Sequence, residues 1–254
     1  MCRYRWTPCS SLVPASAGTT VQMNVSAVKA LWSHADAVCF DVDSTVCTGE
    51  IIDQMADFLG KKEEISQLTT KAMNGGMSFR ESLTLRLQIM QPSLQFVDRF
   101  LKNTSVDLTS GIKTLIRMLH QRSVAVYLLT GGFTHFVNRV AEQLDVPLRN
   151  VYANKLLFDE NGFYCGFDET APTSEDDGKR TVCGQLKNLY GYKRLIMVGD
   201  GMTDACASPP ADAFIGFGGN QVRPAVISKA HWYVYSFQEL IDALNVSDSS
   251  MPKG

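Results

Sequence analysis

The feature that most constrains this chain is an apolar run that ends in two carboxylates. Val38, Cys39 and Phe40 are followed by Asp41 and, one residue later, by Asp43. A short continuous apolar run is typical of a strand buried in a parallel sheet. Ligands of open α/β sheets bind beyond the carboxyl ends of the strands, and side chains at i and i+2 of an extended chain point to the same side. We therefore expect both carboxylates at one binding edge.

A bound cation would relieve the repulsion between two such neighbouring carboxylates, and oxygen ligands favour Mg²⁺. An acidic turn that caps the next helix would produce the same pair, so the pair alone does not decide the question. Two further strands add evidence. The run 125–129 ends at Thr130, and the run 195–198 is followed by Asp200 and Asp204. Side chains with polar or acidic groups thus come just after three of the predicted strands.

Taken in order, these motifs resemble the four signature motifs of the haloacid dehalogenase superfamily of aspartate-nucleophile phosphotransferases. The motifs are Asp41-Val-Asp43-Ser-Thr, Thr130-Gly-Gly, a spaced Lys179 and Gly-Asp200-Gly-Met-Thr-Asp204. From about residue 31 to residue 244 the chain is similar to the phosphoserine phosphatase family, including residues 168–173 and 209–220. The resemblance implies Mg²⁺-dependent hydrolysis of O-phosphoserine to serine and phosphate, the last step of serine biosynthesis, through a phosphoaspartate.

The resemblance also implies a role for each matching residue. Asp41 would attack phosphorus, and Asp43 would protonate the leaving oxygen and later deprotonate water. The catalytic set is Asp41, Asp43, Thr130 and Lys179. The metal set is Asp41, Asp200 and the backbone carbonyl of Asp43, with Asp204 in support. The substrate-binding set is Glu50, Met73, Asn74, Arg86, Thr130, Gly131, Gly132, Lys179 and Thr203.

Two of these residues have ordinary alternatives. Thr130 would donate its hydroxyl to a phosphoryl oxygen beside the amide of Gly131, where we expect a helix to begin, but a helix N-cap would also suit a threonine. Lys179 would neutralise charge on Asp41 and the phosphate, whereas an isolated lysine is usually a solvated surface residue. The order of the motifs favours the functional interpretation for both.

Substrate choice is expected to depend on Glu50 and Arg86. Arg86 comes three residues after Leu83, on the apolar side of a predicted helix, where an unpaired cation would be costly. By resemblance Arg86 binds the serine carboxylate, Glu50 the ammonium, and Met73 lines the pocket. An ion pair between Arg86 and a carboxylate of the cap is the structural alternative. Asn74 stands where the family often has glycine, which leaves its backbone contact to substrate open.

The alternation of strands and helices predicts a three-layer, doubly wound, mostly parallel α/β sheet. Four short helical patterns between the first two motifs predict an inserted cap, and Asn161-Gly162 predicts a β-hairpin attached to the sheet. A cap suits this chemistry because a phosphoenzyme must be shielded from bulk water. The expected divisions are a flexible lead-in at 1–30, core at 31–49 and 106–246, cap at 50–105 and a disordered tail at 247–254.

Composition limits the partners. The chain has 254 residues and a net charge of −2, so it lacks the basic field that nucleic acid binding needs. No apolar run approaches the roughly 20 residues of a membrane span. We therefore expect a small-molecule partner, and a homodimer is compatible with this composition. Seven cysteines without a C-x-x-C pair fit a reducing, cytoplasmic location, although residues 1–22, with Arg3 and Arg5 and no acid, resemble an organelle-targeting leader.

Two other classes share part of this pattern. A receiver-like signalling module also places an aspartate and Mg²⁺ at a strand end, but it would lack the cap and the pair Glu50 and Arg86. A related phosphatase or phosphotransferase of the superfamily would share every core motif. Hydrolysis of O-phosphoserine with water as the only acceptor distinguishes these possibilities.

Overall fold

The computed structural model describes residues 24–73 and 77–249. Its centre is a six-stranded sheet in the order β3-β2-β1-β6-β7-β8, in which every pairing is parallel. The strands are β1 (Ala37–Phe40), β2 (Ala125–Phe133), β3 (Val151–Asn154), β6 (Leu195–Gly199), β7 (Ala213–Phe217) and β8 (Trp232–Val234). The doubly wound α/β fold predicted from the sequence is confirmed.

Two details of the sheet differ from the prediction. Strand β3 was not predicted, because only Asn154 of its four residues is buried and the segment therefore lacks a continuous apolar run. The predicted hairpin is present as β4 (Leu156–Phe158) and β5 (Tyr164–Phe167), but it forms a separate two-stranded antiparallel sheet and does not pair with the main one. Its turn instead contacts the cap, where Gly162 O accepts a hydrogen bond from the Leu94 amide.

Alternate residues of each strand point to opposite faces of the sheet, which gives three layers. Val38 and Phe40 face α1 (Val25–Ser33), α6 (Ile112–Gln121), α7 (Thr134–Gln143) and α11 (Phe237–Ser249). Ala37 and Cys39 face the layer of α8 (Gly178–Tyr190), α9 (Met202–Ala205) and α10 (Pro224–Ile227). Strand β1 is buried on both faces, which explains its continuous apolar sequence.

Helix α1 corrects the expected lead-in. Residues 25–30, placed in a flexible segment by the sequence, form the first turns of this helix. Val28 and Trp32 are fully buried, and the Trp32 indole Nε1 donates a 3.0 Å hydrogen bond to Leu240 O of α11. Helix α1 is therefore part of the folded core. At the other end α11 runs to Ser249, past the expected start of a disordered tail at residue 247.

We expect Trp32→Ala to destabilise the fold strongly, although it lies far from the candidate chemistry. Removal of a fully buried aromatic side chain costs about 3–5 kcal/mol, and this one also carries a hydrogen bond. Urea denaturation should show this loss. Val25→Ala on the same helix, where the side chain is 45% exposed, should change stability by less than about 0.5 kcal/mol. Similar small losses in both variants would contradict this placement of α1.

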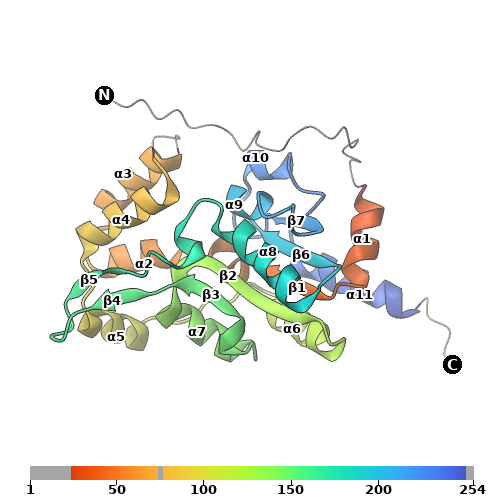
Figure 1. Cartoon of the computed structure of the whole chain (residues 1–254), viewed down its shortest axis with the longest axis horizontal. Coiled ribbons are helices and arrows are strands. Elements are labelled where there is room, and N and C mark those ends of the chain that lie inside the picture. The colour runs from red at the N-terminus through yellow and green to blue at the C-terminus, as the bar shows by residue number, and fades with distance from the viewer. Residues whose placement is uncertain (1–23, 74–76, 250–254) are drawn as a thin grey trace.

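The cap consists of α2 (Ile51–Phe58), α3 (Lys62–Met73), α4 (Phe79–Met90) and α5 (Leu94–Asn103), which lie with the hairpin on one side of the sheet in Figure 1. The four inserted helices are as predicted. Helix α4 begins with a capping box in which the side chains of Ser78 and Glu81 each bond to the backbone of the other residue. No helix within the described ranges is long and apolar enough to cross a bilayer.

Candidate active site

The candidate site lies where the order of the strands reverses. Strands β1 and β6 are neighbours, but the chain continues from β1 toward β2 on one side and from β6 toward β7 on the other. Asp41 directly follows β1, and Asp200 directly follows β6. Ligands of doubly wound sheets bind at such a switch point. Parallel pairing therefore brings together two carboxylates that are 159 positions apart in the sequence.

A buried lysine joins two of the carboxylates. Lys179 Nζ donates to Asp41 Oδ1 and to Asp204 Oδ1, at 2.6 Å each. Lys179 is only 8% exposed, so the alternative of a solvated surface lysine is wrong. Burial disfavours its charged form, but Asp204 and Asp41 outweigh burial and raise the pKa of Lys179. This ammonium group is therefore a fixed positive charge beside Asp41.

Asp43 lies beside Asp41 but has different partners. Its Oδ1 accepts a 2.8 Å hydrogen bond from the Ile51 amide, and its Oδ2 accepts a 3.0 Å hydrogen bond from the Thr130 hydroxyl. Burial, together with the charges of Glu50 and Asp41, raises the pKa of Asp43 to about 7. Asp43 is thus held by donors from the cap helix α2 and from β2, while Asp41 is held by α8.

The surroundings of Thr130 differ from the prediction. Strand β2 continues through Phe133, and α7 begins at Thr134, so no helix begins at Gly131 and Thr130 is not an N-cap. A buried strand extension took the place of the expected turn. Thr130 Oγ1 still gathers polar groups, because it accepts a 2.8 Å hydrogen bond from the Gly132 amide and donates to Asp43.

Both glycines after Thr130 are required by close approach. A Cβ on Gly132 would lie 3.0 Å from Asp43 Oδ2, and a Cβ on Gly131 would lie 2.4 Å from the Phe79 ring of α4. At the second of these distances a larger residue would require the Phe79 ring to shift. The Gly131 carbonyl accepts a 2.8 Å hydrogen bond from the Asn154 side chain. The strand end is therefore fixed from the core side and covered by the cap.

The described residues contain one group of three acidic side chains suited to a metal ion. One oxygen each of Asp41, Asp200 and Asp204 lies within 4.8 Å of the others, and all three residues are buried. Burial and the charge of Asp41 raise the pKa of Asp200 to about 8 and that of Asp204 to about 7. A divalent cation would stabilise the ionised forms. The donor set of Asp41, Asp200 and Asp204 fits such a cation.

The partners of the two later aspartates separate their roles. Asp204 uses Oδ1 for Lys179 and Oδ2 for the Gly201 amide. Asp200 Oδ1 accepts a 3.0 Å hydrogen bond from the Thr45 hydroxyl, whereas its buried Oδ2 accepts none from the described residues. Arg223 Nη2 lies 2.9 Å from that oxygen, close enough for an ion pair but without hydrogen-bond geometry. Asp200 thus has the oxygen better suited to a cation, and Asp204 holds Lys179.

Arg223 and Thr45 were missed by the sequence analysis. Arg223 Nη2 also lies 3.3 Å from Glu50 Oε1, so one guanidinium pairs with the first cap residue and with Asp200. No local motif marks Arg223, which precedes α10. Thr45 belongs to the first motif, and its position in that motif was the available signal.

The expected substrate residues lie partly within the described structure. Glu50 accepts a 3.0 Å hydrogen bond from the Ser44 hydroxyl. Arg86 makes no ion pair with any described residue, and its buried Nε has no hydrogen-bond partner. Burial lowers the pKa of Arg86, with Asp53 and Glu50 acting in the opposite direction. The structural alternative, an ion pair with a cap carboxylate, is therefore not observed.

Three further residues were expected to contact the substrate. Thr203 is half-buried in the first turn of α9, just after Asp200. Met73 ends α3, but its side chain and the whole of Asn74 lie outside the described residues. The expectations for Met73 and Asn74 therefore stay predictions.

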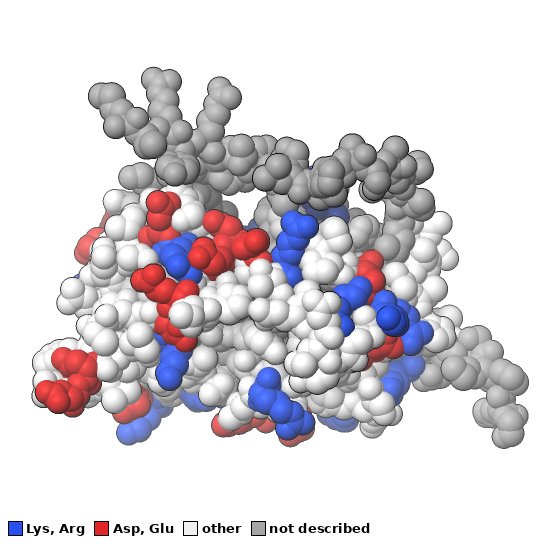
Figure 2. All heavy atoms as spheres, viewed as in Figure 1, with Lys and Arg blue, Asp and Glu red and all other residues white. Residues whose placement is uncertain are grey.

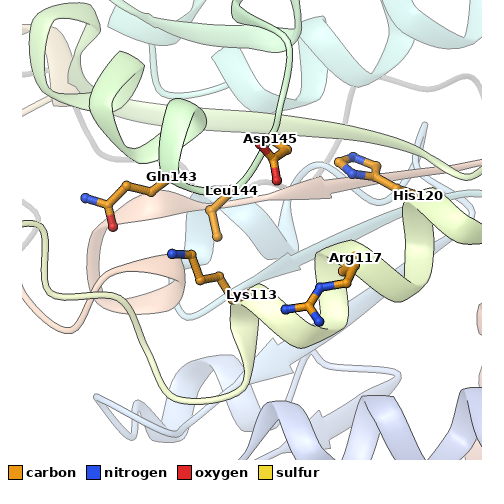
Figure 3. A pocket seen from close by; sticks show the side chains of 6 residues that line it. All are labelled: Lys113, Arg117, His120, Gln143, Leu144 and Asp145. Atoms are coloured by element: carbon orange, nitrogen blue, oxygen red, sulfur yellow. The ribbon is translucent and has the colours of Figure 1, made fainter.

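A small cavity of about 90 Å³ lies elsewhere, between α6 and the end of α7 (Figure 3). It is lined by Lys113, Arg117, His120, Gln143, Leu144 and Asp145. None of the candidate site residues lines this cavity, which is therefore separate from the strand-end chemistry.

Comparison with known proteins places the chain in a family. Residues 35–209 match the family described as haloacid dehalogenase-like hydrolase. The phosphoserine phosphatase of Rattus norvegicus is 49% identical over 219 residues, which cover 86% of this chain and 97% of the rat protein. The chain belongs to the phosphoserine phosphatases of this hydrolase family.

Two further relatives support this membership. The chloroplastic phosphoserine phosphatase of Arabidopsis thaliana is 42% identical over 217 residues, or 85% of this chain and 74% of that protein. A solved structure of a phosphoserine phosphatase with an analogue of its phospho-aspartyl intermediate is 25% identical, with a TM-score of 0.71. The match covers 82% of this chain and 98% of that one.

Proposed function

We propose that this family member hydrolyses O-phosphoserine to serine and inorganic phosphate. The observation that carries the proposal is the buried arrangement of Asp41, Lys179 and Asp200 at the switch point of the sheet, covered by a cap that brings Glu50 and Arg86. The names of relatives at 49% and 42% identity supply the substrate. A receiver-like module does not account for the cap.

The positions of the side chains support the following chemistry. Asp41 attacks phosphorus through the oxygen that Lys179 does not hold, and the bond from phosphorus to the serine oxygen breaks. Asp43 gives its proton to that oxygen, so serine leaves as the alcohol. Water then attacks the phosphoaspartate, Asp43 takes the proton of the water, and phosphate leaves while Asp41 is restored. Thr130 and Lys179 donate to the phosphoryl oxygens during both steps.

The substrate head group is proposed to bind between cap and core. A serine carboxylate would supply the ion-pair partner that Arg86 does not have among the described residues, and Glu50 would accept from the ammonium group. Gly131, Gly132 and Thr203 would contact the phosphoryl group from the two strand ends. Serine is thus distinguished from other alcohols by a cation on α4 and an anion at the residue that precedes α2.

Turnover by water alone is the direct test of the proposal. Purified protein with O-phosphoserine and Mg²⁺ should release serine and inorganic phosphate in equal amounts, with no added alcohol. A phosphotransferase of the same superfamily would need an acceptor alcohol, and its phosphate release would rise with the concentration of that acceptor. Absence of turnover in wild type would overturn the proposal.

We propose Mg²⁺ as the metal, held by Asp41, Asp200 and the carbonyl of Asp43, and we expect strict dependence on it. The cation would stabilise the negative charge of the transferring phosphoryl group, and such stabilisation is on the order of several kcal/mol, or a hundredfold or more in rate. Exhaustive chelation should abolish turnover, and Mg²⁺ should restore it. Ca²⁺ should inhibit, because it favours more ligands and could engage both oxygens of Asp41. Activity that survives chelation would contradict this proposal.

The cellular location is proposed from the cysteines. The buried thiols of Cys39, Cys47 and Cys183 are free, which suits a reducing compartment such as the cytoplasm. The chloroplastic relative shows that organelles also house the family, and the expected leader at 1–22 lies outside the described residues. A homodimer stays a prediction.

A further inference from the structure

One arginine of the cap is bound to the core by several contacts. Arg80, in the first turn of α4, places Nη2 2.7 Å from each of the Glu169 carbonyl, the Ser174 hydroxyl and a Glu175 carboxylate oxygen. Its Nη1 lies 3.7 Å from the Glu169 carboxylate. The residue beside it adds a contact, because the Phe79 amide donates a 2.8 Å hydrogen bond to Asp176. We call this set of contacts from residues 79–80 to residues 169–176 the clasp.

The clasp brings a basic side chain of the cap next to acidic side chains of the core. Figure 2 shows acidic side chains gathered around a basic group where α4 meets the loop before α8. Arg80 has a side chain only 28% exposed, and its partner Ser174 is fully buried. The ion pair of Lys62 with Asp57 differs, because both residues belong to the cap and their side chains are 71% and 64% exposed. Exposed pairs of that kind contribute little.

The two sides of the clasp lead to two residues of the candidate site. Arg86 lies six residues after Arg80 on the same helix, about 9 Å along its axis. Lys179 is the second residue of α8, which follows the acidic loop. That junction is tightly packed, since a Cβ on Gly178 would lie 1.9 Å from the Pro172 carbonyl oxygen. The clasp is therefore connected to Arg86 through helix α4 and to Lys179 through the tight turn before α8.

We infer that Arg80 is a positioning residue for substrate recognition: it sets the separation between Arg86 on the cap and the phosphoryl site on the core. Arg80 belongs to neither the substrate set nor the metal set proposed above, and it acts through Arg86. This inference rests on the proposed function, because it is the O-phosphoserine carboxylate that needs this separation. A lysine would keep the charge but has a single nitrogen, so it could not serve both the acceptors around Nη2 and the Glu169 carboxylate that Nη1 faces.

Steady-state kinetics of three variants test the inference. Arg80→Met keeps the aliphatic stem and removes every polar contact, and Arg80→Lys keeps the stem and the charge but has one nitrogen in place of the guanidinium group. Both should lower kcat/KM for O-phosphoserine about tenfold, mainly through KM, because ground-state binding of the carboxylate is lost. Hydrolysis of a small aryl phosphate, which has no carboxylate, should change less than about twofold. Lys62→Met, which breaks the exposed ion pair with Asp57, is the matched control, and its kcat/KM for both substrates should equal that of wild type.

A double-mutant cycle separates positioning from general stability. On an Arg86→Ala background, Arg80→Met should cost less than about twofold for O-phosphoserine, since the residue through which it acts is gone. Additive losses would overturn the inference, as would equal losses for both substrates. Full recovery in Arg80→Lys would also overturn it, because charge alone would then be sufficient.

Hydrogen exchange gives a readout that does not depend on the substrate. The amides of residues 79–82 should exchange at least about tenfold faster in Arg80→Met than in wild type, because the first turn of α4 opens locally when the clasp is broken. In Lys62→Met the exchange rates of these amides should be unchanged. Unchanged exchange in Arg80→Met would overturn the inference. If wild type failed to hydrolyse O-phosphoserine, the proposed function would fail, whereas the exchange experiment would still decide whether Arg80 holds α4 to the core.

Discussion

Asp41→Asn is expected to abolish turnover while leaving the protein folded. The change keeps the size of the side chain but removes the nucleophilic oxygen, and loss of a covalent nucleophile costs on the order of 10⁴–10⁶-fold in kcat. Lys179 keeps Asp204 as a partner, so the buried ammonium would not be left alone. Intact-mass spectrometry of acid-quenched wild type with O-phosphoserine should detect one added phosphoryl group, and the variant should show none.

Asp36→Asn provides a matched control on the same strand. Asp36 precedes β1, at the opposite end from Asp41, and its carboxylate pairs with Arg194 at 2.6 Å. This partner, by its hydrogen bond, lowers the pKa of Asp36, so the substitution removes an ionised carboxylate without touching the site. The control should keep turnover and still accept the phosphoryl group. A phosphorylated peptide that maps to Ser44 or Thr45 would contradict the assignment of Asp41.

The parts of this site that the sequence predicted are those with a local pattern. A strand buried on both faces must be continuously apolar, so β1 and β6 and the carboxylates after them could be located from hydropathy alone. The capping box of Ser78 and Glu81 is another local pattern, because it marks the start of α4 within four residues of sequence. The motifs then gave the order in which these pieces meet.

The parts that the sequence could not predict depend on contacts between distant residues. Arg223 pairs with Glu50 across 173 positions, and Arg80 bonds to Ser174 across 94. Exposed or half-buried charged residues such as these look alike in a sequence until the fold chooses their partners. Strand β3 was missed for a related reason, since a mostly half-buried edge strand has no period of its own. Thr130 was placed at a helix start because Thr-Gly-Gly suits a turn as well as a strand end.

Arg86→Ala should reduce selectivity for O-phosphoserine more than it reduces the chemistry. A lost charge-assisted hydrogen bond costs about 1.5–3 kcal/mol, which corresponds to a fall in kcat/KM of roughly tenfold to more than a hundredfold. Arg86 has no ion pair among the described residues and its Nε is unpaired, so its removal breaks no salt bridge of the cap. A small aryl phosphate presents no carboxylate, and its hydrolysis should therefore be far less affected.

The contrast between the two substrates decides what Arg86 does. Gln88→Ala, at an exposed position of the same helix, controls for general disturbance of α4. Its kcat/KM should equal that of wild type with both O-phosphoserine and the aryl phosphate. Equal losses with both substrates in Arg86→Ala would mean that Arg86 holds the cap together. Phosphoethanolamine provides a second test on wild type, because it keeps the ammonium that Glu50 would bind but lacks the carboxylate. Since a site built around a charged partner rejects analogues without it, phosphoethanolamine should be a poor substrate, and equal turnover would count against carboxylate recognition by Arg86.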